Sequence, residues 1–459
     1  MTRLSHWLIA PVFLLGLSQA KPTVPRRCAK LKVPLDYTDP DNQKEVALDL
    51  TKIEALTKPS KGSILINFGG PGEPARGSFA SNQLALMLLG LTGGEYDLIG
   101  FDPRFGERTV RNRPGQNRRW LVSSRKRPEL GRLKHNKTGQ FLGTSFIARD
   151  MMQIVDALDE DGMLRYWGMS YGTYIGAVAA NMFPNKIDKM MLGAVVNPFD
   201  WRLDHDFESL IDTDATFSRF YLEKKLYKFF DGLRLEPMVF QGVILDYKSV
   251  KASLYANLKY PENWQLMSKI LDVMMKRDSK MLEALGGDGG GGGSSTTKES
   301  QWGIRCNDMT GQTDDIHDVI PILNKRWDTS RFAADVIEDV VMRCSRWKLP
   351  AKERYEGDFK AKTKNPVLVI GQTSDPITPM ASARNLAGTL EGSVLLEFNI
   401  PGHSILRRSS ECVIKATAAY WSEGKLSKNN TVCKSDVEPF STETGWVEMI
   451  KELGMGPKE

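Results

Sequence analysis

The sequence predicts an α/β fold built on a doubly wound, mostly parallel sheet with helices on both faces. Short apolar runs, each followed by turn residues and a helical pattern, alternate along the first 200 or so of its 459 residues. Strand-like patterning resumes near residue 366, after a stretch rich in helix formers and aromatics. We therefore expect one sheet that is interrupted by a helical insertion.

Continuous apolar runs of this length are typical of strands that are buried on both faces. The alternation of apolar and polar residues over Glu45–Ile53 instead predicts an antiparallel edge strand. Helical patterns over Phe146–Leu158 and Tyr171–Met182 predict two of the covering helices. The predicted buried strands are Ser63–Phe68, Tyr96–Phe101, Leu164–Trp167, Lys189–Val196, Pro366–Ile370 and Val394–Phe398.

These patterns divide the chain after a leader at residues 1–20. The sheet is expected from residues 21–200 and 348–459, and a helical cap from residues 201–347. Within the cap, Gly286–Thr297 reads GGDGGGGGSSTT, which cannot pack a core and predicts a flexible loop. An insertion at this point would cover the active edge of the sheet.

The first twenty residues have the pattern of a secretory signal peptide. Arg3 supplies a positive start, residues 7–17 are almost continuously apolar, and small residues follow at 18–20. The apolar stretch is too short to span a bilayer, and no other run of 18 apolar residues is present. We expect a secreted protein without a membrane anchor.

An oxidising destination makes the five cysteines informative. Cys306 and Cys344 flank one segment, and Cys412 and Cys433 flank another near the carboxyl terminus. We predict these two pairs as disulfides, which leaves Cys28 as the odd cysteine.

The same destination gives meaning to two glycosylation sequons, at Asn136 and Asn429. The net charge of +6 is uneven, because residues 104–137 hold twelve Lys and Arg against two acids. Only Trp120 interleaves with these cations, so the segment is better explained as a solvated loop than as a nucleic-acid site. Its dibasic pairs are possible processing sites.

Ser170 lies between two glycines in the sequence YWGMSYGTY, directly after an apolar run. Gly168 and Gly172 permit a strand-to-helix turn so tight that it lifts the serine hydroxyl out of the backbone. An ordinary turn with small residues is the alternative, so the neighbouring motifs have to decide.

A nucleophilic serine needs a base and a carboxylate that orients the base. Of five histidines, His403 alone follows a predicted strand at the edge where the serine turn would emerge. Asp375 follows the preceding strand, in GQTSDPITP, and gives the chain order Ser, Asp, His. A turn-capping role is the alternative for Asp375, and Asp102 is the weaker rival for the acid.

The first predicted parallel strand ends in NFGGPG, where glycines let backbone N–H groups approach a substrate oxygen. Pro71 has no N–H, so we expect Gly70 and Tyr171 to supply the two oxyanion donors. The sequence contains no HExxH and no CxxC motif, so no metal and no other cofactor are predicted.

At this point the sequence resembles the tripeptidyl aminopeptidase-like branch of the α/β-hydrolase superfamily, related to prolyl iminopeptidases. The resemblance rests on CAKLKVPLDY, NFGGPG, GFDPR, GMSYGTYIG, WGIRCND and above all on residues 366–440. It implies a triad of Ser170, Asp375 and His403, supports the Cys412–Cys433 pair, and suits a secreted, fungal-type member.

The sequence also departs from the family pattern. No cysteine follows DPR, so the usual partner of Cys28 is missing, and Tyr221 and Leu222 stand where a cap cysteine is usual. Family members that trim peptide N-termini need a cap carboxylate for the α-ammonium group. Glu208, Asp212 and Asp214 are the candidates here, with a role as ordinary solvated acids as the alternative.

The leading function is therefore a secreted serine hydrolase that releases short units from the N-terminus of peptides. The alternative enzyme is an esterase, thioesterase or amidase that acts on a small molecule such as a secondary metabolite. A non-catalytic binding protein on the same scaffold is a third reading, against which the complete triad argues. The expected partner is a peptide or a small ester or amide, not nucleic acid or membrane.

Overall fold

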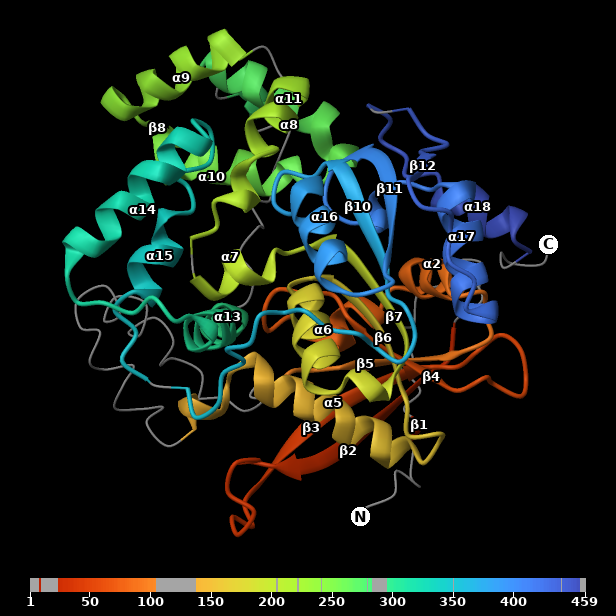
Figure 1. Cartoon of the computed structure of the whole chain (residues 1–459). Helices are drawn as coiled ribbons and strands as arrows, with labels where there is room; N and C mark the ends of the chain where they lie inside the picture. Colours follow the sequence, from red (N-terminus) through yellow and green to blue (C-terminus); the bar gives the residue numbers. More distant parts are fainter. Residues whose placement is uncertain are drawn as a thin grey trace.

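A large, mostly parallel sheet forms the centre of the molecule (Figure 1). The computed structural model describes residues 8–9, 24–104, 138–203, 205–220, 223–240, 242–278, 280–282, 295–349, 351–438 and 440–454. Seven neighbouring strands from β5 to β12 run parallel, and β1 to β3 add an antiparallel flank. The strand order is β1 (Leu8–Ile9), β2 (Arg26–Pro34), β3 (Glu45–Ile53), β5 (Asp97–Phe101), β4 (Ser63–Asn67), β6 (Leu164–Ser170), β7 (Ile187–Val195), β10 (Leu368–Ser374), β11 (Val394–Pro401) and β12 (Thr431–Lys434).

The predicted fold class is confirmed, since all six predicted parallel strands lie in this sheet. The prediction for β3 was half wrong: the strand is antiparallel, but it lies between β2 and β5 instead of at the edge. Its outer neighbour, β2, was not predicted, because its alternating Lys and Arg residues weaken the apolar signal in RRCAKLKVP.

Helices cover both faces of the sheet (Figure 1). One face packs against α5 (Thr144–Leu158), α6 (Tyr171–Met182) and α16 (Met380–Thr389), and the other against α1 (Ala75–Phe79), α2 (Asn82–Leu91), α17 (Glu411–Glu423) and α18 (Trp446–Glu452). Local signals set the ends of these helices: the Ser410 hydroxyl accepts the Val413 N–H at the start of α17, which ends at Gly424 in the left-handed region.

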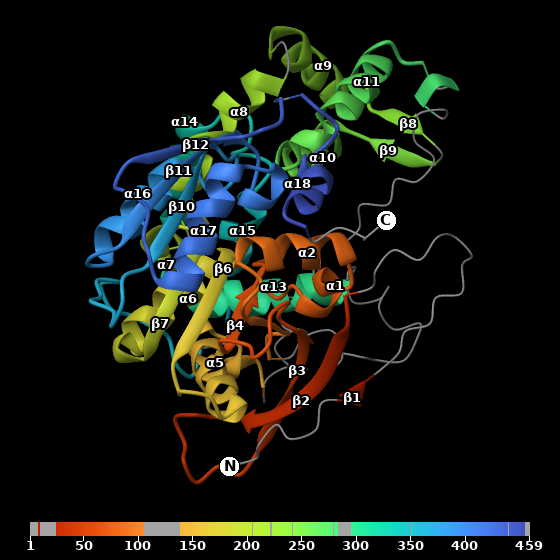
Figure 2. The same cartoon turned by 90° about the vertical axis from the view of Figure 1, so that its right-hand side faces the viewer.

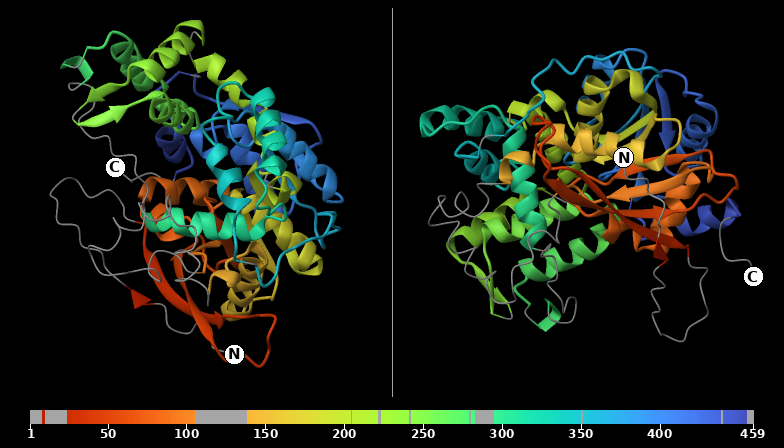
Figure 3. Two further views of the ribbon diagram at one scale, coloured as in Figure 1. Left: turned by 90° about the vertical axis from the view of Figure 1, so that its left-hand side faces the viewer. Right: turned by 90° about the horizontal axis from the view of Figure 1, so that it is seen from below.

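The segment between β7 and β10 is mainly helical and has its own apolar core (Figures 1 and 2). A two-stranded hairpin, β8–β9, lies at its outer end (Figure 3). Its elements are α7 (Pro198–Leu203), α8 (Thr213–Phe220), α9 (Glu223–Leu235), β8 (Met238–Phe240), β9 (Val243–Leu245), α10 (Tyr247–Leu258), α11 (Trp264–Met275), α13 (Ser295–Asp308), α14 (Ile316–Thr329) and α15 (Glu338–Cys344). Short 3₁₀ turns occur at Gly139–Phe141, Pro184–Lys186, Glu208–Leu210, Pro261–Asn263 and Ile405–Arg407.

Several predictions fall largely outside the described residues: the leader, the basic segment with Asn136, and most of the glycine run. The prediction of a flexible loop over the glycine run is wrong in part, because α13 begins at Ser295 and makes the last three residues of the run helical. Hydroxyl residues are common at helix starts, which explains that boundary. Asn429 is exposed just before β12. Among the described residues, no helix is long and apolar enough to cross a bilayer.

A buried ion pair joins the antiparallel flank to α5. The Arg104 guanidinium donates to both oxygens of Asp150, and one nitrogen also donates to the Leu35 carbonyl at 3.0 Å. Tyr37 donates a further hydrogen bond of 2.7 Å to Asp150. The Arg104 side chain is 0% exposed and that of Asp150 is 1% exposed, so water could not solvate either charge if its partner were removed.

Replacing Asp150 with alanine should therefore leave a buried, uncompensated guanidinium and cost about 3–5 kcal/mol of folding free energy. Thermal unfolding should show a much lower melting temperature. The matched control is Glu391→Ala, which removes an exposed pair with Lys362 and should leave the melting temperature almost unchanged. Equal melting temperatures for the two variants would contradict this role of Asp150.

Candidate active site

The serine motif forms the turn between β6 and α6. Ser170 ends the strand with a φ of 55°, a conformation that few non-glycine residues adopt. A Cβ on Gly168 would collide with the carbonyl oxygen of Gly172, and a Cβ on Gly172 would lie 2.7 Å from the carbonyl oxygen of Asn67. Gly168 is therefore required by the tightness of the turn itself, and Gly172 by the close approach of the turn to the end of β4.

Asp375 and His403 lie together in the loops after β10 and β11. The Nδ1 atom of His403 is 2.8 Å from Oδ2 of Asp375, which is 0% exposed. The other carboxylate oxygen accepts the backbone N–H groups of Ile377 and Thr378, at 2.9 and 3.0 Å. The Thr378 hydroxyl donates to Oδ2 at 2.7 Å. Four donors thus hold the carboxylate in place beside the imidazole.

Adjacent contacts bring the serine turn and the histidine loop together. The Ser404 hydroxyl, next to His403, contacts the sulfur of Met169, next to Ser170, at 3.7 Å. On the other side, a Cβ on Gly69 would lie 2.7 Å from Cβ of Ser170 and 3.1 Å from the Tyr171 nitrogen. The loop that holds Gly70, the other predicted oxyanion donor, therefore borders the same turn.

Asp102, the rival acid, lies elsewhere. Its Oδ1 accepts the backbone N–H of Arg76 at 3.4 Å, near the start of α1. Among the residues that the structure describes, no group of three or more His, Cys, Asp or Glu side chains could hold a metal ion.

The three acids considered for a substrate amine have different surroundings. Asp214 accepts the backbone N–H groups of Arg331 and Phe332 at 3.0 and 3.1 Å, so it caps a turn. Glu208 accepts hydrogen bonds from Asn197 and Ser382 at 2.7 and 2.8 Å.

Asp212 is half-buried and accepts the Met380 N–H at the longer distance of 3.4 Å. Burial raises the pKa of Asp212, and the nearby Asp375 carboxylate raises it further. Arg219 and Arg384 lower this pKa in part, so the charge of Asp212 is partly compensated and interacts with the Asp–His pair.

The insertion holds both loops of the Asp–His pair. The backbone carbonyl of Lys259 accepts the His403 N–H at 3.0 Å, and Pro261 packs against Gly402. On the aspartate side, the hydroxyl of Thr213 donates to the Pro376 carbonyl at 2.7 Å. These contacts were not predicted, because nothing in the sequence pairs residues so far apart.

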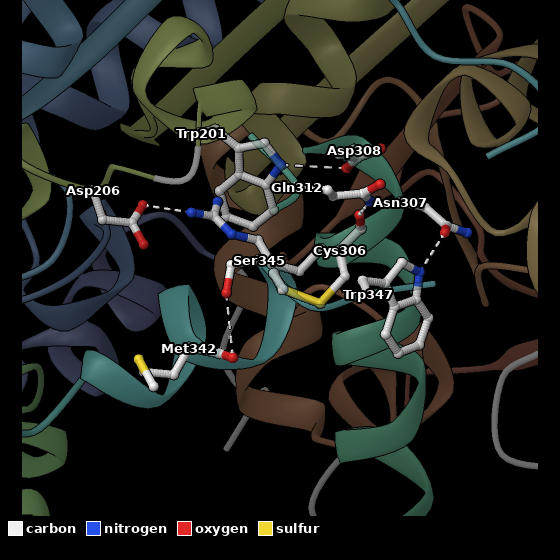
Figure 4. The surroundings of a disulfide bond; sticks show 11 residues. Trp201, Asp206, Cys306, Asn307, Asp308, Gln312, Met342, Ser345 and Trp347 are labelled. Atoms are coloured by element: carbon white, nitrogen blue, oxygen red, sulfur yellow. Dashed lines mark hydrogen bonds and ion pairs between the residues drawn. A yellow bond between two sulfur atoms is a disulfide. The ribbon is translucent and has the colours of Figure 1, made fainter. Parts of the chain in front are cut away.

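Asp308 is the last residue of the motif WGIRCND, and the sequence predicted no role for it. Its carboxylate lies at the start of α5, where it accepts the backbone N–H of Thr144 at 2.8 Å and the hydroxyl of that residue at 2.6 Å. Trp201 donates its indole N–H to the same carboxylate at 3.3 Å (Figure 4). The Thr144 hydroxyl also lies 2.6 Å from the Tyr171 hydroxyl.

The structure contains disulfides between Cys306 and Cys344 and between Cys412 and Cys433, while Cys28 is free. The first disulfide ties α13 to α15 beside Trp201 and Asp308 (Figure 4). A nearby cavity of about 260 Å³ is lined by residues of the insertion and by none of the predicted site residues.

Comparison with known proteins gives a consistent result. The chain is 25% identical to the serine protease Hip1 of Mycobacterium tuberculosis over 88% of this chain and 87% of that protein. It is 23% identical to a tripeptidyl aminopeptidase of Streptomyces lividans over 90% of this chain and 85% of the relative. Among solved structures, the α/β hydrolase MGS-M2 from a deep-sea metagenome library has 12% identity and a TM-score of 0.39, over 84% of this chain and 98% of its own.

The sheet topology and these sequence relatives define the class: the chain is a serine hydrolase of the α/β-hydrolase superfamily. Within it, the carboxyl-terminal part is similar to the TAP-like protein family, whose model matches residues 329–433. The resemblance drawn from the motifs is thereby confirmed, whereas its fungal-type detail stays a prediction.

Gly172→Ala tests the serine turn, because the new Cβ would meet the Asn67 carbonyl at 2.7 Å. We expect loss of Ser170 labelling by a fluorophosphonate probe and a lower melting temperature. Gly232→Ala is the control, since its Cβ would meet nothing within 4 Å and alanine favours a helix. Full labelling of Gly172→Ala would contradict the steric argument.

Burial raises the pKa of Asp308 from its ordinary value of 3.8 to about 6. When the pKa of an acid is higher in the folded protein than in the unfolded one, the acid contributes stability that is fully present below its unfolded pKa. This contribution is lost as the pH rises through the folded pKa. Relative to Asp308→Asn, the wild type should lose stability between about pH 4 and pH 6 and stay level above. Melting temperatures of the two proteins across this pH range measure the effect. A difference between them that does not change with pH would contradict the raised pKa of Asp308.

Proposed function

We propose that this serine hydrolase is a secreted peptidase that releases short units from the N-terminus of peptides through Ser170, His403 and Asp375. The observation that carries the proposal is the 2.8 Å contact between His403 and Asp375 beside the strained Ser170 turn. Relatives named serine protease and tripeptidyl aminopeptidase support peptides as the substrate class.

In the proposed reaction, the Ser170 hydroxyl attacks the carbonyl carbon of the scissile bond. Nε2 of His403 takes the hydroxyl proton and later gives it to the leaving amine. Asp375 accepts the Nδ1 hydrogen of His403 and stabilises the imidazolium. Water then attacks the acyl-enzyme, with His403 again acting as the base.

The negative oxygen of the tetrahedral intermediate would lie between backbone N–H groups of Gly70 and Tyr171. Gly70 has a φ of 107° and Tyr171 is the first residue of α6. The start of a helix presents unpaired N–H groups and a partial positive charge, which favours an oxyanion at Tyr171.

We assign the substrate amine to Asp212 among the three candidate acids. Its carboxylate is half-buried, near Asp375, and an ammonium group there would offset the burial and the repulsion that raise its pKa. Asp214 already caps a turn. Asp212→Asn should raise KM for substrates with a free N-terminus by about tenfold, the value of one charge-assisted contact of about 1.4 kcal/mol.

The first experiment is mass spectrometry on a peptide mixture of which half is N-acetylated, with Ser170→Ala as the control. We expect short N-terminal products, two or three residues long, from unblocked peptides and only with the wild type. Equal cleavage of blocked and unblocked chains would contradict the amine site.

A small-molecule esterase or amidase is the second candidate, because the insertion departs from the family pattern at Tyr221 and Leu222. Retained labelling by fluorophosphonate, with hydrolysis of simple esters and cleavage of neither peptide pool, would favour it. Loss of labelling in Ser170→Ala also separates both enzymes from a non-catalytic protein.

A further inference from the structure

We propose that Asp308, on the inserted helix α13, is a positioning residue for Tyr171 and acts through Thr144. The inference rests on the proposed function, in which the Tyr171 N–H stabilises the oxyanion. The inference is carried by a different observation from the one that carries the proposed function. This observation is a continuous chain of hydrogen bonds from the insertion to the residue after Ser170.

The chain has a defined direction. An ionised carboxylate accepts only, so the Thr144 hydroxyl gives its single proton to Asp308 at 2.6 Å. Thr144 must then accept from the Tyr171 hydroxyl, which lies 2.6 Å away. The order of donation therefore runs from Tyr171 to Thr144 to Asp308, and the carboxylate sets it.

Aromatic packing fixes the same tyrosine from the side. The Trp201 ring lies 5.2 Å from the Tyr171 ring and 5.5 Å from the Tyr174 ring, between centroids. Trp201 is itself oriented by its indole N–H, which donates to Asp308 (Figure 4). Asp308 thus reaches Tyr171 by two routes, one hydrogen-bonded and one packed.

Further contacts of helix α13 fix Trp201 and the position of the helix itself. Arg305, one turn before Asp308, stacks 3.6 Å from the Trp201 ring centre and pairs with Asp206 at 2.7 Å. Further along, Ser300 packs so closely on Gly72 that a Cβ there would lie 2.8 Å from the serine Cβ. The helix therefore contacts the loop that holds Gly70 and reaches Tyr171 through Thr144.

An asparagine at 308 would fill the same volume but disturb the order of donors. Its amide N–H₂ would replace one oxygen and face the N–H or O–H groups that now donate to the carboxylate. Thr144 would lose the acceptor that fixes its proton, and Tyr171 would lose its fixed partner. Misplacing one oxyanion donor is costly, because removal of such a donor lowers kcat by roughly 10²–10³.

The test measures the hydrolysis of p-nitrophenyl butyrate by the full chain, because oxyanion stabilisation is needed whatever the acyl group. Asp308→Asn and Thr144→Val should each lower kcat at least tenfold, with KM within threefold of the wild type. Thr144→Ser keeps the hydroxyl and should retain kcat within threefold. The double variant Asp308→Asn/Tyr171→Phe should lose less than the product of the single losses, since both act through one chain.

Asn307→Ala is the matched control on the same helix. Asn307 is buried, donates to the Gly139 carbonyl at 2.6 Å and accepts the Trp347 indole N–H at 2.8 Å, and neither of these hydrogen bonds involves the serine turn. It should lower the melting temperature and leave kcat within threefold. If Asp308→Asn and Thr144→Val behave in the same way, the inference is overturned.

Two further readouts keep the outcomes separate. If Asp308→Asn does not fold, Thr144→Val and Tyr171→Phe decide, since an unchanged kcat in both would overturn the inference. Ser170→Ala tests the proposed function by itself: ester hydrolysis that survives in it contradicts the nucleophile. Hydrolysis that disappears in Ser170→Ala, with full kcat in Asp308→Asn and Thr144→Val, overturns only the positioning role.

Discussion

The close contact of the β6–α6 turn with the end of β4 is the constraint on which the site depends. Gly172 touches the backbone of Asn67, and Gly168 touches Gly172, so neither position has room for a side chain. This contact accompanies a φ of 55° at Ser170, the last residue of β6. It also fixes where α6 begins, and hence where the Tyr171 N–H is presented.

The insertion is part of the scaffold of the proposed catalytic site and not only a cover over it. Lys259 holds the histidine loop, Thr213 holds the aspartate loop, and Asp308 reaches the serine turn through Thr144. The first two contacts pair a residue of the insertion with a loop after a strand of the sheet, and the third pairs Asp308 with the first residue of α5. The loops that a rigid sheet positions in an α/β enzyme are therefore fixed here from both sides.

The sequence allowed the central sheet to be predicted, because buried parallel strands are continuous apolar runs. It also allowed Asp375 and His403 to be chosen, since both follow such strands. Strand β12 (TVCK) and the outer strand β2 carry too little apolar signal to be recognised. Asp308 could not have been given a role, because its partner Thr144 lies 164 residues away and only the docking of α13 brings them together.

The same dependence on distant contacts explains why the substrate is harder to predict than the chemistry. Asp212 and Asp375 lie near enough for one to raise the pKa of the other, and both belong to loops where the insertion meets the sheet. Arg219 and Arg384 offset part of the repulsion between these two carboxylates, and a further cation there would offset more of it. In the proposed peptidase, a free peptide N-terminus would supply that cation, whereas a small neutral ester would not.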